Sequence, residues 1–278
     1  IIWEVRMPRI SLAAIVGASL SISGTTYQGL FRNPLADPYL IGVSSGAGLG
    51  ATLVLVSGIS SPASLPIAAF IGGMTAVCAA YLISRRAGGV PLMTIILAGV
   101  AISSLAGAIG ALLMIRSDPD LRPVLSWLLG GFSSAQWIHS ILMLCYLLPS
   151  IGIIFLYSRI LNVFQLPDDH VKQIGVNVER TKLILIAASS LCTSAAVSFS
   201  GLIGFVGLIA PHTARLILGV DYRKIVPFSM LIGSGFLVIS DLAARILVSP
   251  GELPVGIVTA FCGAPFFLYL LRKRQVRM

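Results

Sequence analysis

The sequence predicts an all-α, polytopic membrane protein, and three observations carry this prediction. Hydrophobic residues make up 56% of the 278 residues and charged residues only 10%, whereas soluble domains carry about 25% charged residues. The mean hydropathy is +0.97. The apolar residues fall into nine runs near the length of about 20 residues that a helix needs to cross a bilayer. Residues 1–278 are expected to form a single transmembrane domain.

Short intervals rich in proline, glycine and charged residues separate the predicted spans, and such residues end helices. A further apolar stretch, residues 124–132, is too short to cross a membrane and is predicted to be an interfacial or re-entrant helix. The nine predicted spans are residues 10–30, 39–56, 65–84, 93–115, 137–160, 183–200, 203–218, 225–247 and 255–271.

The basic residues divide unevenly between the two sides of this topology. When the intervals are assigned alternately to the two sides, one side collects fourteen Lys and Arg residues and the other only five. Cytoplasmic loops carry the excess of positive charge in membrane proteins. The side with fourteen, which includes the C-terminus, is therefore predicted to be cytoplasmic. The net charge of +9 thus indicates orientation and not nucleic-acid binding.

The longest polar interval, residues 162–182, is predicted to contain two short helices. Pro167 suits the first position of a helix, and Asp168 and Asp169 then lie in its first turn, where the helix dipole favours anions. Gly175 can end this helix in a left-handed conformation, and Asn177 can cap the next helix. Two such helices suit the docking of a soluble partner, but an ordinary ordered loop stays open as the alternative from this stretch alone.

The sequence offers no pattern for catalysis, for a metal or for a nucleotide. The Gly-rich stretch 42–50 lacks the Lys-Ser or Lys-Thr that ends a phosphate-binding loop. Its glycines at 42, 46 and 50 instead predict a helical face that packs closely on another helix. The three histidines are scattered and the four cysteines are isolated in apolar runs. We therefore predict no catalytic residue, no metal site and no cofactor in this chain.

Charged residues are rare inside the predicted spans. Asp241 and Arg245, four residues apart on one helical face, are the candidate ion pair near a span. No pair of carboxylates lies mid-span, as a proton-coupled carrier usually needs. This pattern favours an energy source outside the chain. The alternative is an ion-coupled secondary transporter, which would need internal repeats or mid-span charges.

Several motifs, in order along the chain, are similar to those of the FecCD-type family of ABC-importer permeases. They are WEVRMPR, SGTTYQGLFRNPLADPYLIGVSSGAGLGA, the IGV at 174–176, SGLIGFVGLIAPHTARLILGVDYRKIVP, DLAAR and GELPVGIVTAFCGAPFF. The family carries ferric siderophores, vitamin B12, haem and related metal chelates. The resemblance implies the type II ABC importer permease fold, which has ten helices. This sequence is similar to the second to tenth, and a truncated, an unrecorded and a truly missing first helix are all open.

The resemblance also assigns roles to individual residues. The 162–182 interval corresponds to a cytoplasmic coupling loop that docks on an ATPase subunit, and the implied coupling residues are Asp168, Asp169, Gly175, Val176 and Asn177. Three outer arginines correspond to residues that pair with glutamates of a substrate-binding protein, with contact to lipid headgroups as the alternative. These are Arg6, Arg9 and Arg245.

The family's transport pathway runs along the axis of a dimer, and its fifth and tenth helices correspond to residues 93–115 and 255–271. This makes Ser103, Ser104 and Thr259 candidate pathway residues, with hydrogen bonding between helices as the alternative role.

The resemblance implies a permease subunit that imports a metal chelate across a bacterial or archaeal plasma membrane. Ferric siderophore is the first expected cargo, ahead of cobalamin, haem or an oxyanion. The expected partners are a second copy of the chain, two ATPase subunits that bind ATP and Mg²⁺, a substrate-binding protein outside, and membrane lipid. The chain itself is not expected to be an enzyme.

Overall fold

A computed structural model describes residues 1–59, 61–85, 89–116, 122–166, 168–173, 175–248 and 251–275. Each of the nine predicted spans corresponds to a helix, which confirms the predicted all-α class. The helices are α1 (Met7–Leu30, preceded by a π-helical turn at Ile2–Arg6), α2 (Val43–Val56), α3 (Ser64–Ser84), α4 (Leu92–Arg116), α5 (Arg122–Leu129), α6 (Trp137–Val163), α7 (Asp168–Gln173), α8 (Val178–Ser200), α9 (Val206–Leu218), α10 (Tyr222–Ile246) and α11 (Val255–Gln275).

Among the described residues, six helices are long and apolar enough to cross a membrane, and α2, α9 and α11 contain shorter apolar segments. The predicted spans 39–56 and 203–218 were wrong at their starts, since α2 begins at Val43 and α9 at Val206. The Asp37 carboxylate accepts a hydrogen bond from the Tyr39 N–H at 2.8 Å, which favours a turn over a helix. Gly42 and Phe205 then take positive φ angles of 92° and 69° directly before the two helices.

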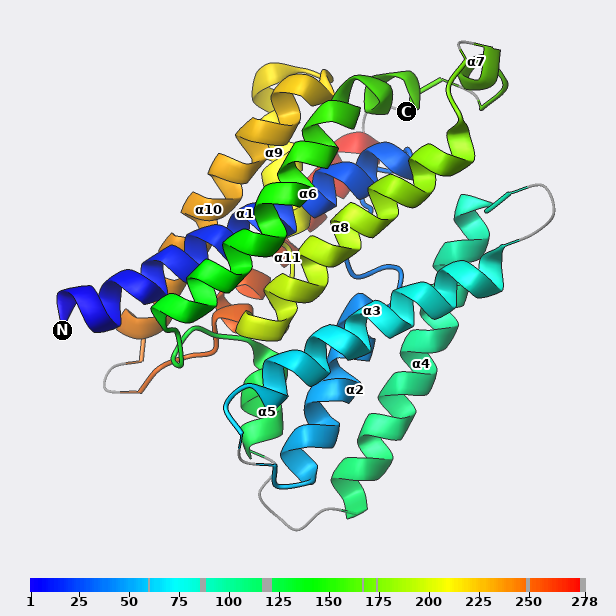
Figure 1. The fold of residues 1–278 in the computed structure, drawn as a ribbon. Helices are drawn as coiled ribbons and strands as arrows, with labels where there is room; N and C mark the ends of the chain where they lie inside the picture. Colours follow the sequence, from blue (N-terminus) through cyan, green and yellow to red (C-terminus); the bar gives the residue numbers. More distant parts are fainter. Residues whose placement is uncertain are drawn as a thin grey trace.

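Helix α1 is the centre of the fold, and every residue from 16 to 30 is buried. It packs against α6, α8, α9 and α10 (Figure 1). Glycines permit the closest approaches: a Cβ on Gly17 would lie 2.3 Å from the Gly233 carbonyl oxygen of α10, and one on Gly24 would lie 2.0 Å from that of Gly207 in α9. The helix backbones therefore touch directly at both crossings.

Helices α2, α3 and α4 form a second packed group beside this centre. A Cβ on Gly46 would lie 2.2 Å from the Gly72 carbonyl oxygen of α3, and one on Gly50 would lie 2.2 Å from the Ala68 carbonyl oxygen. The predicted close-packing face at positions 46 and 50 is thus confirmed. Gly42 differs from the other two because it supplies the left-handed residue before α2.

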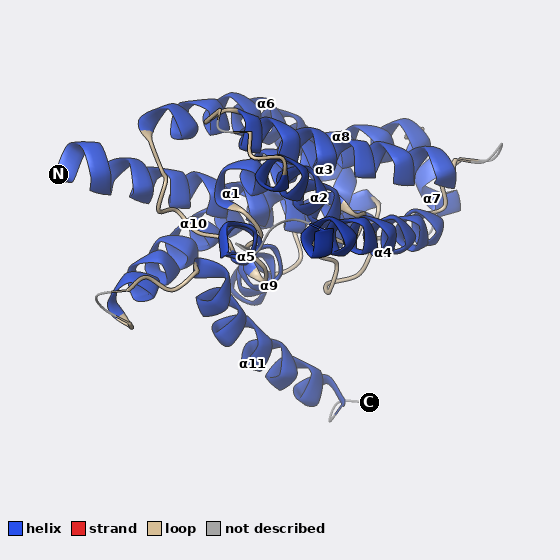
Figure 2. Cartoon of the chain, turned by 90° about the horizontal axis from the view of Figure 1, so that it is seen from below, coloured by secondary structure: helices blue, strands red, loops and turns tan. Residues whose placement is uncertain are grey.

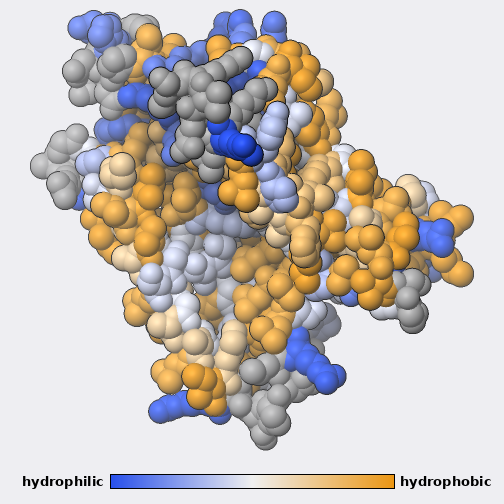
Figure 3. All heavy atoms as spheres, turned by 180° about the vertical axis from the view of Figure 1, so that it is seen from behind, coloured by the Kyte–Doolittle hydropathy of each residue, from blue (hydrophilic) through white to orange (hydrophobic). Residues whose placement is uncertain are grey.

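The intervals assigned to one side of the predicted topology lie at one end of the molecule. Figure 1 shows α7, the end of α6 and the start of α8 at one end, and the N-terminus, α5 and the start of α6 at the other. We call these the α7 end, which is the predicted cytoplasmic end, and the α5 end. Apolar atoms dominate the face in Figure 3, with hydrophilic residues toward its ends. Helix α11 diverges from the other helices toward the C-terminus (Figure 2).

Candidate functional site

The 162–182 interval contains one short helix, α7, between the end of α6 and the start of α8. The prediction of a second short helix was wrong, because residues 178–182 are the first turns of α8, which continues without a break to Ser200. The Asn177 side chain accepts a hydrogen bond from the Arg180 N–H at 3.0 Å, which confirms the predicted cap of α8. Three buried side chains, Phe164, Val171 and Val178, pack together beneath the interval. The described part of the interval therefore has its own small core.

The predicted coupling residues occupy three different settings in this interval. Asp168 and Asp169 begin α7, but their side chains, like Pro167, lie outside the part of the chain that the structure describes. Gly175 has a φ of +85°, and among the described atoms outside its chain neighbours none lies within 4 Å of the position that its Cβ would take. Val176 packs on the small core, while Asn177 is exposed apart from its cap. The left-handed glycine is thus required by backbone geometry and not by lack of space.

Hydrogen bonds anchor the start of the interval to the ends of α1 and α10. Arg32 donates to the Phe164 carbonyl oxygen, and Gln165 donates to the Gly29 carbonyl oxygen at 3.1 Å. Asn162 donates to Asp221, the N-cap of α10, at 2.8 Å and accepts from the Tyr222 N–H at 2.9 Å. A displacement of the interval would therefore act directly on two long helices.

Asp221 is held as an anion at this junction. Arg223 and then Asn162 donate hydrogen bonds to its carboxylate, which lowers its pKa well below the usual range for an aspartate. Nothing in the sequence around Asn162 indicated this contact, because the two partners are 59 residues apart. Arg215 of α9 donates to the buried Gln28 at 2.9 Å, so its side chain reaches into the helix bundle.

A cluster of four charged side chains, which we call the Arg9 cluster, lies at the α5 end. Arg9 Nη2 lies 2.8 Å from Asp241 Oδ1, and Arg9 Nη1 lies 3.0 Å from Glu252 Oε2. Arg245 Nε lies 3.4 Å from Asp241 Oδ2, which confirms the ion pair predicted from their spacing. The Asp241 side chain is only 2% exposed, whereas Glu252 is 46% exposed. Glu252 is therefore the more accessible partner of Arg9.

The three predicted docking arginines thus differ in their surroundings. Arg6 ends the N-terminal π-helical turn and is exposed. Arg9 is 11% exposed and has two carboxylate partners within the chain, while Arg245 is 24% exposed and has one. The sequence placed all three at the same end of the molecule but did not reveal that Arg9 is paired.

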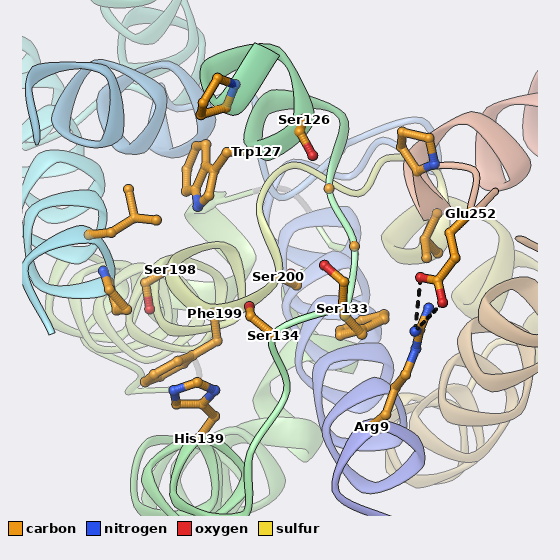
Figure 4. Close-up of a pocket in the computed structure, with 18 of the residues that line it drawn as sticks. Arg9, Ser126, Trp127, Ser133, Ser134, His139, Ser198, Phe199, Ser200 and Glu252 are labelled. Atoms are coloured by element: carbon orange, nitrogen blue, oxygen red, sulfur yellow. Dashed lines mark hydrogen bonds and ion pairs between the residues drawn. The ribbon is translucent and has the colours of Figure 1, made fainter. Parts of the chain in front are cut away.

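A cavity of about 530 Å³ opens beside the Arg9 cluster. Figure 4 shows the Arg9–Glu252 pair at one side of it and Trp127, Phe199 and His139 at the other. Serine hydroxyls from α5, α8 and the segment between α5 and α6 line the space between them: Ser126, Ser133, Ser134, Ser198 and Ser200. The lining thus combines one ion pair with hydroxyls and aromatic rings.

The three predicted pathway residues have separate locations. Ser104 is exposed on α4 and donates to the Val100 carbonyl oxygen at 3.0 Å. Ser103 is half-buried, and its Oγ would lie 3.6 Å from a Cβ on Gly42. Thr259 in α11 is fully buried and donates to the Gly256 carbonyl oxygen at 3.1 Å. Two of the hydroxyls are thus engaged by their own helices, and a pathway role for all three stays a prediction.

Comparison with known proteins gives consistent results over the whole chain. A family model described as the FecCD transport family matches residues 1–273. The chain is 45% identical to a cobalamin import system permease of Halobacterium salinarum, with all of this chain and 74% of that protein aligned. It is 42% identical to a hemin transport system permease of Yersinia pestis, with 99% and 85% aligned.

A solved structure agrees with the sequence comparison. It is an ABC transporter of the metal-chelate type in an inward-facing conformation, with a TM-score of 0.91 and 35% sequence identity. The alignment covers 98% of this chain and 87% of that chain.

Proposed function

The chain belongs to the FecCD transport family, and from this premise we propose that it is the membrane-spanning subunit of an ATP-driven importer of a metal chelate. The observation that carries the proposal is the agreement of the family model and of a solved metal-chelate transporter over nearly the whole chain. In this proposal two copies form the channel, two ATPase subunits bind at the α7 end, and a substrate-binding protein binds at the α5 end. The C-terminus then faces the cytoplasm.

The cargo is proposed to be a metal chelate of the tetrapyrrole type. Two similar permeases are named for cobalamin and for hemin, whose metals sit in related macrocycles. The hydroxyls and aromatic rings around the outer cavity suit such a mixed surface better than they suit a small oxyanion. On these two names, a tetrapyrrole chelate is proposed ahead of the ferric siderophore that was expected first from the sequence.

Reconstitution into proteoliposomes with the cognate ATPase and binding protein tests the proposal. We expect uptake of cobalamin or haemin that requires both ATP and the binding protein. A ferric siderophore in the same assay decides between the two classes of cargo. Uptake that continues without ATP but stops when the ion gradient is collapsed would overturn the proposal in favour of a secondary transporter.

At the α7 end, Gly175→Val is expected to uncouple ATP hydrolysis from uptake. A β-branched residue is strained at a φ of +85°, so the segment between α7 and α8 must change its conformation. The strain costs about 1–3 kcal/mol, and we expect uptake to fall while the protein still inserts and binds the ATPase. Gly175→Asn is the matched control, because asparagine tolerates the left-handed region. Equal uptake by wild type and Gly175→Val would contradict the coupling role.

At the α5 end, Glu252→Gln is expected to strengthen docking of the binding protein. Glu252 occupies Arg9 Nη1 and is 46% exposed, so an incoming carboxylate must compete with it. An exposed ion pair contributes about 0.2–1 kcal/mol, so docking affinity at low salt should rise by about 1.4- to fivefold. Glu4→Gln removes an exposed carboxylate at the same end and serves as the control. Equal gains from both variants would show a general charge effect and not displacement from Arg9.

A further inference from the structure

Gly89 and Val90, which lie just before α4, contact a residue of the 162–182 interval. The Val90 N–H donates a hydrogen bond to Glu179 Oε2 at 2.7 Å. Gly89, with a φ of +115°, lies so close that a Cβ on it would be 2.5 Å from Glu179 Cδ. The carboxylate therefore rests directly on the backbone that leads into α4.

The Glu179 carboxylate is fixed from its other side as well. Lys182 Nζ lies 3.0 Å from Glu179 Oε1, and the Lys182 side chain is only 6% exposed. A hydrogen bond to an ionised group is about twice as strong as one between neutral groups. Glu179 thus connects the first turn of α8 to the α3–α4 connection through a charge-assisted contact.

Glu179 lies next to the cap of α8, so a movement of the start of α8 would act on Val90 through this contact. Asn177, which caps α8, lies two residues before Glu179, and Val90 is buried against the central core at 3% exposure. A favourable interaction with the helix dipole would explain an acid in the first turn of α8. It does not explain why the carboxylate reaches a backbone N–H that lies 89 residues away in the sequence.

The contact between Glu179 and Val90 would act on helix α4. Leu97, Val100 and Leu105 are among its many exposed apolar side chains, and it packs on α2 and α3 along its buried side. On that side Gly99 lies against the backbone of Leu40 and Ile41, in the break before α2. A shift at the base of α4 would therefore also reach this break.

We propose that Glu179 is a positioning residue that transmits movement of the 162–182 interval to α4. The proposal rests on the proposed function, since it needs an ATPase that moves the interval. It predicts two arrangements of α4, one for each nucleotide state. The coupling is established only if a measurement shows that the populations of these two arrangements change with nucleotide. The contact with Val90 is expected to persist while the interval moves.

The test uses the assembled transporter in proteoliposomes with Glu179→Ala. We expect uptake to fall by about tenfold, the factor that corresponds to one charge-assisted hydrogen bond, while ATP hydrolysis stays within about twofold of wild type. Glu179→Gln keeps an oxygen that can accept from Val90 and should restore part of the uptake. Arg85→Gln changes an exposed charge at the end of α3 and should leave uptake unchanged.

A spectroscopic measurement separates positioning from simple loss of structure. A spin label on the exposed Met93, in a variant without the four native cysteines, reports the position of the α4 start in both copies. In wild type the distance between labels should change with nucleotide, and in Glu179→Ala it should not. Normal uptake or a normal distance change in Glu179→Ala overturns the inference, as does an equal loss in Arg85→Gln. Absence of ATP-dependent uptake in wild type would instead overturn the proposed function.

Discussion

Asp241→Ala should lower the free energy of unfolding by about 3 kcal/mol, the lower end of the range for breaking a buried ion pair, because the partly buried Arg9 then keeps only Glu252 as a partner. The Asp241 side chain is 2% exposed and binds both Arg9 at 2.8 Å and Arg245 at 3.4 Å. Glu252 cannot replace it, since it already binds a different nitrogen of Arg9. Thermal unfolding of the purified protein in detergent measures the loss.

Two further variants show whether the loss comes from the uncompensated charge. Arg245→Ala removes the longer and more exposed contact and should cost about 1 kcal/mol or less. The double variant Arg9→Met/Asp241→Leu removes both members of the buried pair and leaves only the more exposed Arg245 without its carboxylate. Replacing a buried ion pair with apolar residues is often neutral. The double variant should therefore unfold close to the wild-type temperature. An Asp241→Ala protein as stable as wild type would refute the importance of the Arg9 cluster.

Gly17→Ala should disrupt the crossing of α1 and α10. The three atoms nearest the added methyl group all belong to the α10 backbone, and the first is the Gly233 carbonyl oxygen at 2.3 Å. No side chain can rotate away, so the helices must separate, with an expected cost of about 3 kcal/mol, the upper part of the range for overpacked cores. The yield of monodisperse protein and its unfolding temperature should both fall.

Gly235 provides the matched control on the facing helix. No atom lies within 4 Å of the position that its Cβ would take, and the residue is exposed. Alanine is favoured over glycine inside a helix by about 0.5–1 kcal/mol, so Gly235→Ala should be as stable as wild type or more so. Equal behaviour of Gly17→Ala and Gly235→Ala would show that the crossing tolerates expansion.

The helices could be predicted from the sequence because their signals are local. Long apolar runs and the capping pattern around Asn177 depend on neighbouring residues, and both were confirmed. The starts of α2 and α9 were not predicted, because residues 39–42 and 203–205 are apolar enough to continue a helix. The turn before α2 combines a local hydrogen bond from the Tyr39 N–H to Asp37 with a tertiary one from the Tyr39 hydroxyl to the Ile203 carbonyl oxygen at 3.0 Å.

The candidate site likewise contains contacts that local spacing predicts and contacts that only the folded chain reveals. The pair of Asp241 and Arg245 follows from helical spacing, whereas Arg9 reaches Asp241 across 232 residues. The contact of Glu179 with Val90 uses a backbone N–H. Every residue except proline has this donor, so the sequence does not indicate which one a carboxylate will bind. Local spacing therefore identified candidate residues at both ends of the molecule, but their partners required the folded chain.

The burial of α1 also constrains how the protein is made. This helix is synthesised before its four main partners, and α6, the first of them, begins only at Trp137. At a synthesis rate of 5–20 residues per second, α1 waits on the order of ten seconds for that partner. Hydroxyls of Ser19, Thr25 and Thr26 bond to carbonyl oxygens one turn earlier in the same helix, each at 2.8 Å. The nascent helix can therefore satisfy these polar groups in lipid before the rest of the chain surrounds it.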